Sequence, residues 1–364
     1  MARWQKILVV QTSFLGDTVL TLPLLSEIKR RFPESELSAL CTPQSAQLLS
    51  DHPDIDEVIL DDKKSADKGW TGLWRKATLL KRKGFTMVLC PHKSFRSALL
   101  LFLAGIPWRI GFRQSNGWFL FHVRVNRDPS QHDVERNLSI LTALDISPED
   151  CRRTINLPID SRVEETMDSV FRSLGVDTAK PVIGINPGSV WPTKRWAPES
   201  FARLIGLLKA ETDCEVVLFG GPEDADTVAQ VQRLAPDAAV SLAGKTSLRE
   251  LAAALSRCAV FVSNDSGPMH IAVARGVPVV AIFCATTPSL GFYPYSSRAV
   301  VVEKRLSCRP CSLHGGRRCP LGTEDCIRLI EPEVVLQAVR RLLNGPTVPA
   351  EMNRSEYVPQ WMAV

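Results

Sequence analysis

The feature that most constrains the fold of this chain is a repeated alternation of short apolar runs with amphipathic stretches. Apolar runs of this length fit buried strands, and the stretches between them carry apolar residues at helical spacing. The expected strands span residues 7–10, 37–41, 57–60, 87–90, 182–186, 215–219, 260–263 and 279–283. The expected helices span residues 19–31, 45–49, 70–83, 95–103, 198–211, 225–234, 247–257, 269–275 and 333–343. Such alternation predicts βαβ units and parallel sheets, so the expected fold class is α/β.

The pattern restarts near Lys180, where Pro181 follows a polar stretch and a new apolar run begins. A chain of 364 residues has room for two or three domains, and we expect two doubly wound domains joined near residues 158–180. Ligands of such sheets bind at the carboxyl ends of strands, so the expected site is a cleft between two facing domains. The tail has no period, and we expect it to be poorly ordered. The expected divisions are 1–170, 171–345 and the tail 346–364.

The composition excludes several classes of protein. The formal net charge is +5 and the isoelectric point is about 8.7, a smaller basic excess than a dedicated nucleic-acid-binding protein carries, so we expect no nucleic-acid partner. The excess does suit an anionic substrate or an anionic membrane surface. Gln11 and Asp17 interrupt the apolar residues near the N-terminus, which argues against a signal peptide, and no stretch reaches the roughly 18 apolar residues of a membrane span. We therefore expect a cytoplasmic protein with reduced thiols.

The strongest motif is Ser263-Asn264-Asp265-Ser266-Gly267-Pro268-Met269-His270, which lies between an expected strand and an expected helix. Gly267 lets a ligand approach the backbone, Pro268 fits the first helical turn, and the free N–H groups of a helix start bind anions. Asp265 can bind sugar hydroxyls, Ser266 can hydrogen-bond a phosphate, and His270 can add a donor. A simple capped helix would explain Ser266 and Pro268, but not Asp265 and His270 together.

Two more polar segments follow expected strands of the second half. In Pro187-Gly188-Ser189-Val190-Trp191-Pro192-Thr193-Lys194-Arg195-Trp196, two cations beside a Gly-Ser turn suit a phosphate site, where Lys194 would offset the charge of a leaving diphosphate. A surface loop with a solvated Lys-Arg pair is the alternative. In Gly220-Gly221-Pro222-Glu223, the carboxylate of Glu223 is placed to bind ribose hydroxyls, although ordinary capping of the next helix would also explain it.

Asp17 follows the first expected strand, in Thr12-Ser13-Phe14-Leu15-Gly16-Asp17. There it would face the cleft opposite the anion sites, where a carboxylate can act as a general base on a hydroxyl. Capping of the helix that follows is the alternative. Three other chemistries lack their motifs, because the chain has no Walker P-loop, no G-x-G-x-x-G in the first βα turn and no G-x-S-x-G elbow.

These motifs, in this order, resemble the bacterial ADP-heptose:lipopolysaccharide heptosyltransferases of glycosyltransferase family nine, over nearly the whole chain. The likeness rests on K-I-L-V-V-Q-T-S-F-L-G-D at 6–17, P-G-S-V-W-P-T-K-R-W at 187–196, F-G-G-P-E-D at 219–224 and N-D-S-G-P-M-H at 264–270. A cysteine block near the C-terminus looks like the heptosyltransferase II branch. The resemblance implies a GT-B fold, in which two Rossmann-like domains bind the acceptor and the nucleotide sugar.

The resemblance also implies roles for individual residues. It implies transfer of L-glycero-D-manno-heptose from ADP-heptose to the first heptose of the lipopolysaccharide inner core, with inversion by direct displacement. Asp17 matches the catalytic base, and Lys194 matches the lysine that supports the diphosphate. Glu223 matches the ribose-binding acid, and Thr246 falls where the family packs adenine. The remaining contacts to the donor phosphates and sugar match Ser189, Asp265, Ser266, Gly267 and His270. This chemistry needs no metal and no cofactor.

The implied acceptor is an anionic glycolipid, which suggests peripheral contact with the cytoplasmic face of the inner membrane. Basic clusters in the first half could meet the acceptor or the anionic leaflet, although solvated helix faces would also explain them. These clusters are Lys29-Arg30-Arg31, Lys81-Arg82-Lys83, and Lys93 with Arg96.

Four of the ten cysteines form the block C-x2-C-x7-C-x6-C, at Cys308, Cys311, Cys319 and Cys326. The start of the block is zinc-like but its spacing is irregular, so zinc ligands, reduced structural thiols and disulfides all stay open. Alternative functions are a heptosyltransferase I, another GT-B enzyme such as a nucleotide-sugar epimerase, and a sugar-nucleotide-binding module without catalysis. The presence of Asp17 argues against the last of these.

Overall fold

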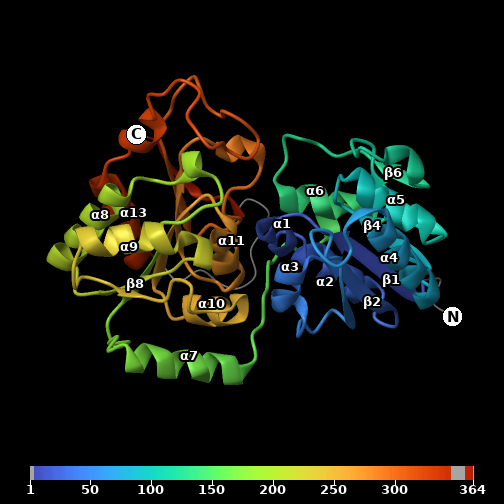
Figure 1. The fold of residues 1–364 in the computed structure, drawn as a ribbon, viewed down its shortest axis with the longest axis horizontal. Helices are drawn as coiled ribbons and strands as arrows, with labels where there is room; N and C mark the ends of the chain where they lie inside the picture. The colour runs from blue at the N-terminus through green and yellow to red at the C-terminus, as the bar shows by residue number, and fades with distance from the viewer. Residues whose placement is uncertain (1–3, 346–356, 364) are drawn as a thin grey trace. The chain divides into compact units, whose positions relative to one another are not determined.

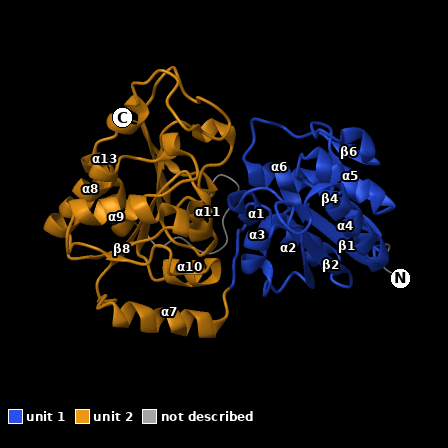
Figure 2. Ribbon diagram, viewed as in Figure 1, with its two compact units in different colours: residues 1–158 blue, residues 159–364 orange. Residues whose placement is uncertain are grey.

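The computed structural model describes residues 4–345 and 357–363. The chain divides into two compact units, residues 1–158 and residues 159–364 (Figure 2). Each unit is built on its own parallel sheet with helices along it, which confirms the expected α/β class and the doubly wound sheets. The expected division at residue 170 falls inside helix α7 (Ser161–Ser173), which belongs to the second unit.

Unit 1 holds a six-stranded parallel sheet in the order β3-β2-β1-β4-β5-β6 (Figure 1). Its strands are β1 (Lys6–Gln11), β2 (Glu36–Cys41), β3 (Glu57–Leu60), β4 (Met87–Cys90), β5 (Trp108–Phe112) and β6 (Val123–Val125). Its helices are α1 (Leu15–Val19), α2 (Leu22–Arg31), α3 (Pro43–Leu49), α4 (Gly69–Lys83), α5 (Phe95–Leu103), α6 (Asp133–Ser139), and the short 3-10 turns η1 (Trp118–Leu120), η2 (Ile140–Leu144) and η3 (Pro148–Asp150).

Strand periodicity places the core of unit 1. Leu8 and Val10 of β1 pack in one cluster with Leu73 and Leu80 of α4 and Leu101 of α5, because alternate residues of a strand point to the same face. The strand order reverses between β1 and β4, which makes the carboxyl end of β1 the switch point where a doubly wound sheet binds its ligands. Asp17 lies just beyond this end.

Unit 2 holds a seven-stranded parallel sheet in the order β13-β12-β11-β10-β7-β8-β9. Its strands are β7 (Val182–Asn186), β8 (Glu215–Leu218), β9 (Val240–Ser241), β10 (Val260–Asn264), β11 (Val279–Phe283), β12 (Ala299–Glu303) and β13 (Gln360–Ala363). Besides α7, its helices are α8 (Pro198–Glu211), α9 (Ala225–Leu234), α10 (Leu248–Leu255), α11 (Gly267–Ala274), α12 (Asp325–Arg328) and α13 (Pro332–Leu343), with 3-10 turns η4 (Pro192–Lys194), η5 (Pro222–Asp224) and η6 (Pro288–Leu290).

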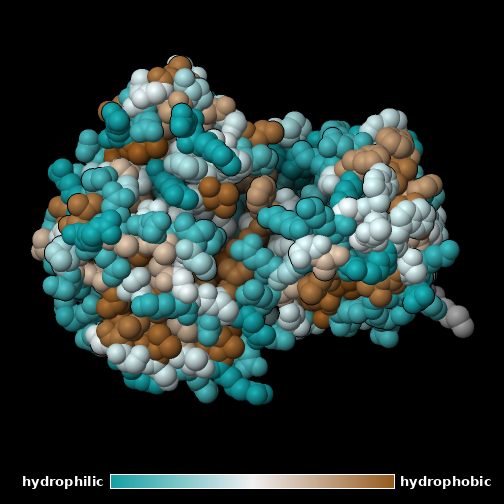
Figure 3. Space-filling model, viewed as in Figure 1, coloured by the Kyte–Doolittle hydropathy of each residue, from teal (hydrophilic) through white to brown (hydrophobic). Residues whose placement is uncertain are grey.

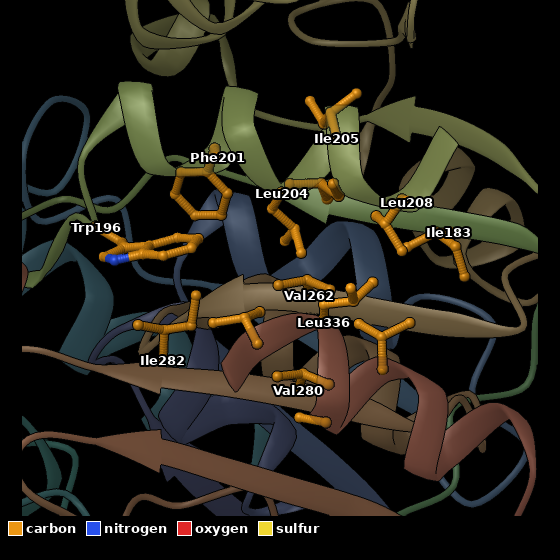
Figure 4. Packing of buried hydrophobic residues seen from close by; sticks show 14 of the residues in the cluster. Ile183, Trp196, Phe201, Leu204, Ile205, Leu208, Val262, Val280, Ile282 and Leu336 are labelled. Carbon is orange, nitrogen blue, oxygen red and sulfur yellow. The ribbon is translucent and has the colours of Figure 1, made fainter. Parts of the chain in front are cut away.

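The core of unit 2 joins side chains of α8 and α13 to those of β7, β10 and β11 (Figure 4). Trp196 is fully buried in it, with its ring centroid 4.9 Å from that of Phe201. Its indole Nε1–H donates to the carbonyl of Ile330 over 3.0 Å. The switch point of this sheet lies between β7 and β10, so the loops that leave these two strands flank the expected ligand position.

Several expectations about the fold were wrong or incomplete. The expected helix 19–31 begins later, as α2 at Leu22, because Pro23 lacks an N–H and fits the first turn of a helix; the separate short helix α1 precedes it. The expected joining segment 158–180 holds α7, whose polar sequence buries only Met167 and Phe171. The tail is not wholly irregular, since β13 pairs with β12; residues 346–356 and 364 lie outside the described part of the chain.

Some elements were absent from the sequence-based expectation altogether. These include β5, β6, β9, β12, α6 and α12. Among the described residues, none of the helices is both long enough and apolar enough to cross a membrane.

Candidate active site

The polar centre of unit 2 is an ion pair between Lys194 and Asp265. Lys194 ends η4 after β7, and Asp265 follows β10, so the two loops that flank the switch point meet here. The Lys194 Nζ lies 2.7 Å from Asp265 Oδ2, and both side chains are largely buried. The hydroxyl of Thr286, which follows β11, donates to the same oxygen over 2.6 Å. Three strand ends thus converge on one carboxylate, and the ammonium group is held where a phosphate could approach it.

His270 lies beside this pair, in the first turns of α11. Its side chain is buried, and its Nδ1 has no hydrogen-bond partner among the described residues. Burial lowers the pKa of His270 to about 4; the Asp265 carboxylate opposes the shift and the Lys194 ammonium adds to it. The imidazole is therefore neutral near pH 7, and no described residue uses the hydrogen-bonding capacity of its buried Nδ1.

The turn at the start of α11 is partly open to solvent, since Ser266, Gly267 and Pro268 are half-buried. Ser266 is the N-cap residue, but its hydroxyl makes no capping bond and instead lies 3.1 Å from Ser263 Oγ and 3.4 Å from Asn186 Nδ2. The first N–H groups of α11 thus have no side-chain cap from Ser266, which suits an anion at this position.

Asn264 fixes the loop that carries Ser189 and Lys194. Its amide donates to the carbonyl of Pro187 over 2.8 Å and accepts from the N–H of Trp196 over 3.0 Å. Within the loop, Arg195 Nε donates to the carbonyl of Ser189 over 2.7 Å, and Ser189 is buried. The alternative of a freely solvated Lys-Arg pair is wrong, because Lys194 pairs with the largely buried Asp265 and Arg195 binds a carbonyl of its own loop.

The loop after β8 packs against the same segment through Asp224. A Cβ on Gly188 would lie 2.1 Å from the Asp224 carboxyl carbon, so only glycine allows this approach. Asp224 Oδ2 accepts from the N–H of Gly221 over 3.1 Å, and burial raises the pKa of this carboxyl. Its neighbour Glu223 is exposed and free to meet a ligand.

Thr246 lies half-buried in the loop after β9. The N–H of Gly244 donates to the carbonyl of Gly220 over 2.9 Å, which joins this loop to the one that carries Glu223. The residues expected to bind the nucleotide therefore follow neighbouring strands at one edge of the sheet. Those expected to bind diphosphate and sugar lie around the switch point.

In unit 1, Asp17 is the third residue of α1, and its Oδ2 accepts from the N–H of Phe14 over 3.1 Å. The contact is of the capping kind, although Asp17 is not the N-cap residue. Burial, followed by the charge of Asp133, raises the pKa of Asp17 from an ordinary 3.8 to about 6, while hydrogen bonds from Ser13 and Phe14 and the charge of Arg127 act the other way. A carboxylate with such a pKa holds a proton more readily than a solvated one, as a general base near neutral pH should.

Sequence reasoning missed two residues that hold the centre of unit 2. Thr286 binds Asp265, and Arg309 binds the turn in which Thr286 lies. The buried Arg309 guanidinium donates to the carbonyls of Phe283 and Thr286, over 2.7 and 2.5 Å, and to those of Cys284 and Lys304. It also pairs with Glu303 at 3.1 Å. The only sequence signal was its place inside the cysteine block.

The cysteine block covers part of this centre. The N–H of Gly316 donates to Thr193 Oγ1 over 2.8 Å, and a Cβ on Gly315 would lie 2.8 Å from Lys194 Cγ. All ten cysteines are described and all are free thiols, so the disulfide alternative is wrong. Across residues 4–345 and 357–363, no group of three or more His, Cys, Asp or Glu side chains is placed to hold a metal ion, which leaves the zinc alternative without support.

Comparison with known proteins identifies the family. The model of glycosyltransferase family 9 (heptosyltransferase) matches residues 73–318, more than half of the chain. The chain belongs to this family. The matched region contains Lys194, Asp265 and His270, while Asp17 precedes it.

Similar proteins extend the likeness to nearly the full length. The lipooligosaccharide heptosyltransferase 2 of Haemophilus influenzae is 26% identical over 93% of this chain and 99% of that protein. A glycosyltransferase family 9 structure from Veillonella parvula matches with a TM-score of 0.83 and 26% identity, covering 93% of this chain and 97% of that one. The ADP-heptose LPS heptosyltransferase II of Escherichia coli matches with a TM-score of 0.74 and 25% identity, over 93% and 98%. The two parallel sheets with flanking helices match the GT-B architecture of these heptosyltransferases.

Proposed function

We propose that this member of glycosyltransferase family 9 transfers L-glycero-D-manno-heptose from ADP-heptose to the first heptose of the lipopolysaccharide inner core. The observation that carries the proposal is the Lys194–Asp265 pair, with His270 beside it, at the switch point of unit 2. The similar proteins support this donor and acceptor, because they include a lipooligosaccharide heptosyltransferase 2 and an ADP-heptose LPS heptosyltransferase II.

In the donor complex, Lys194 would face the diphosphate and offset the negative charge that grows as ADP leaves. Asp265 holds the ammonium group in place through the 2.7 Å contact and offers its second oxygen to a sugar hydroxyl. His270, neutral because it is buried, would donate a hydrogen bond to the same groups. Donors fixed in this way before reaction stabilise charge in the transition state more effectively than mobile water does.

The nucleotide would extend along the neighbouring strand ends. Ser189, Ser266 and the N–H of Gly267 would hold the phosphates, the exposed carboxylate of Glu223 would bind the ribose hydroxyls, and Thr246 would pack near adenine. The order of these residues follows the order of β10, β7, β8 and β9 in the sheet, which suits an extended dinucleotide-like ligand.

Asp17 is the proposed general base. Direct displacement with inversion needs a base on the acceptor hydroxyl and support of the leaving group on the opposite face of the sugar. A pKa of about 6 leaves Asp17 mostly deprotonated at pH 7.5 and still able to accept a proton in the reaction. The mechanism requires Asp17 of unit 1 and the donor held by unit 2 to meet in the reacting complex.

We place the reaction at the cytoplasmic face of the inner membrane, with the enzyme bound peripherally. A glycolipid acceptor is anchored in that membrane, and the basic clusters of unit 1 suit its anionic surface.

The decisive experiment incubates the purified protein with ADP-heptose and a series of truncated core acceptors, with products measured by mass spectrometry. We expect one added heptose on an acceptor that already carries the first heptose. Addition only to an acceptor without it would make the enzyme a heptosyltransferase I, and conversion of ADP-heptose without acceptor would favour an epimerase.

The same assay tests the base. Asp17→Ala should lower transfer by at least about 100-fold and leave the affinity for ADP-heptose unchanged. Transfer by Asp17→Ala at the wild-type rate would refute the role of this carboxylate.

A further inference from the structure

The most unusual surface of unit 1 is formed by α4 and the elements beside it. Residues 63–83 hold eight Lys or Arg and one Asp, a formal charge of +7. The whole chain carries +5, so the rest of the chain is net negative. The positive character of this protein is therefore concentrated in one helix and the loop that leads into it.

The charges on this segment are largely unpaired. Its single acidic residue, Asp67, is buried and already pairs with Arg75 at 2.8 Å and Lys76 at 3.1 Å. Within the described part of the chain, four exposed cations of the segment form no ion pair: Lys64, Lys68, Lys81 and Arg82. A groove of about 440 Å³ on the outer face of α4 is lined by Arg75, Lys76, Thr78, Leu79 and Arg82, which suits an anionic headgroup.

Large aromatic side chains are exposed on the same surface. Trp70 and Trp74 are 69% and 55% exposed and lie four residues apart on α4, so they share one face of the helix. α5 packs beside α4, and η1 packs beside α5. We call the exposed aromatic side chains of these three neighbouring elements the aromatic face: Trp70, Trp74, Phe95, Phe102, Trp118 and Phe119.

Three members of the aromatic face, from α5 and η1, pack against one another. The rings of Phe95 and Phe119 lie 6.4 Å apart and those of Trp118 and Phe119 6.0 Å, and the Arg124 guanidinium lies 4.9 Å from the centroid of the Trp118 ring. Figure 1 labels the positions of α4 and α5. In the same region of Figure 3, brown and white residues, which are apolar or weakly polar, gather next to teal, hydrophilic ones. Exposed apolar surface of this kind, bordered by one sign of charge, marks an interaction surface.

We propose that the aromatic face and the cations of α4 form the docking surface of this enzyme on an anionic phospholipid bilayer. Tryptophan favours the headgroup level of a membrane, where its ring is in an apolar layer and its N–H is in a wet one. Lysine and arginine beside it meet the negative surface of the leaflet. A protein partner fits less well, because the cores of protein interfaces are depleted in lysine, and six of the eight cations in residues 63–83 are lysines.

The inference deepens the proposed function by naming the surface that brings the enzyme to a membrane-anchored acceptor. It rests on the proposed function in one respect, the identity of that acceptor. We would measure flotation of the full chain with vesicles of phosphatidylglycerol and phosphatidylcholine, or of phosphatidylcholine alone, in 0.05 M and 1 M NaCl. We expect binding to the anionic vesicles at low salt and release at high salt, where the screening length falls to about 3 Å.

Two variants address the two parts of the surface. Trp70→Ala with Trp74→Ala removes exposed rings, and Lys81→Glu with Arg82→Glu reverses exposed charges. Each pair should weaken partitioning by at least about tenfold. Matched controls in unit 2 are Leu313→Ala with Leu321→Ala, which removes exposed apolar side chains, and Arg162→Glu with Arg172→Glu on α7, which makes the same change in charge. Both controls should float like the wild type.

Absence of wild-type binding at 0.05 M NaCl would overturn the proposal, as would equal binding by the α4 variants. If the wild type bound no vesicles but formed a dimer, and the Trp70→Ala/Trp74→Ala variant were a monomer, the surface would be assigned to a second copy of the chain instead. Transfer to a soluble truncated acceptor should be unchanged in the α4 variants, whereas transfer to acceptor embedded in anionic vesicles should fall. A wild type that binds vesicles but transfers no heptose would refute the proposed function and leave the docking surface standing.

Discussion

Asp17 should make the folded protein less stable at the pH at which it works. Its pKa rises from an ordinary 3.8 to about 6 in the folded protein, because burial and the Asp133 charge disfavour the carboxylate. The folded state therefore binds a proton more tightly than the unfolded state does. Protonation of Asp17 therefore stabilises the folded protein. This stabilisation is fully present below about pH 4 and is lost as the pH rises through about 6.

The size of the effect follows from the shift. A rise from 3.8 to about 6 corresponds to at most about 3 kcal/mol of destabilisation above pH 6. Asp17→Asn keeps the shape of the side chain, and its amide oxygen can still accept from the N–H of Phe14. We therefore expect Asp17→Asn to be more stable than the wild type by up to about 3 kcal/mol at pH 7.5 and equal to it at pH 4, as measured by urea unfolding.

A matched variant should behave in the opposite way. Partial burial acts to raise the pKa of Asp56. Two hydrogen bonds outweigh it and lower the pKa of this carboxyl: one from Lys29 Nζ over 2.8 Å and one from the N–H of Leu37 over 2.7 Å. Asp56→Asn should thus lose stability at pH 7.5 and lose little at low pH. Destabilisation by Asp17→Asn at pH 7.5 would refute our account of the Asp17 environment.

The same pKa predicts the pH dependence of the reaction. Transfer by the wild type should level off above about pH 6 and fall about tenfold for each pH unit below it, because only the carboxylate accepts the acceptor proton. A rate that stays level down to pH 4.5 would show that this carboxyl is not the group that limits the reaction.

Three substitutions test contacts in unit 2. Lys194→Met leaves the buried Asp265 without its counter-charge, so the free energy of unfolding in urea should fall by about 3–5 kcal/mol. Lys194→Arg keeps the charge and should lose much less. Equal stability of the two variants would contradict the buried pair. Trp196→Phe removes the donor to the buried Ile330 carbonyl, and the free energy of unfolding should fall by about 1–3 kcal/mol, whereas no loss would argue against that bond. Thr286→Val removes the hydroxyl bonded to Asp265, and the KM for ADP-heptose should rise about fivefold or more; an unchanged KM would separate Thr286 from the site.

The elements that sequence reasoning found are those with a clear period. Apolar runs such as 182–186 and 279–283 became central strands, and α5, α8 and α9 have the expected bounds. The missed helix α7 is mostly polar and buries two side chains, so its apolar stripe is too thin to recognise. The missed β13 pairs with β12 across a long stretch of chain, and such long-range pairing leaves no local pattern.

A similar limit applies to the site. Asp17, Lys194, Asp265 and His270 could be named because they stand in polar motifs after apolar strands. Arg309 could not, because a buried guanidinium that binds carbonyls of a distant turn has no local signature. The partner of Lys194 also had to come from the fold, because nothing in the sequence shows that this expected phosphate-binding cation pairs with Asp265.

The anomeric configuration of the transferred heptose tests the central claim most directly. The product of the wild-type enzyme, formed from ADP-heptose and a soluble truncated acceptor, would be examined by NMR. Displacement assisted by Asp17, without a covalent intermediate, predicts the configuration opposite to that of the donor. A heptose that keeps the configuration of the donor would contradict the mechanism and require a different role for this carboxylate.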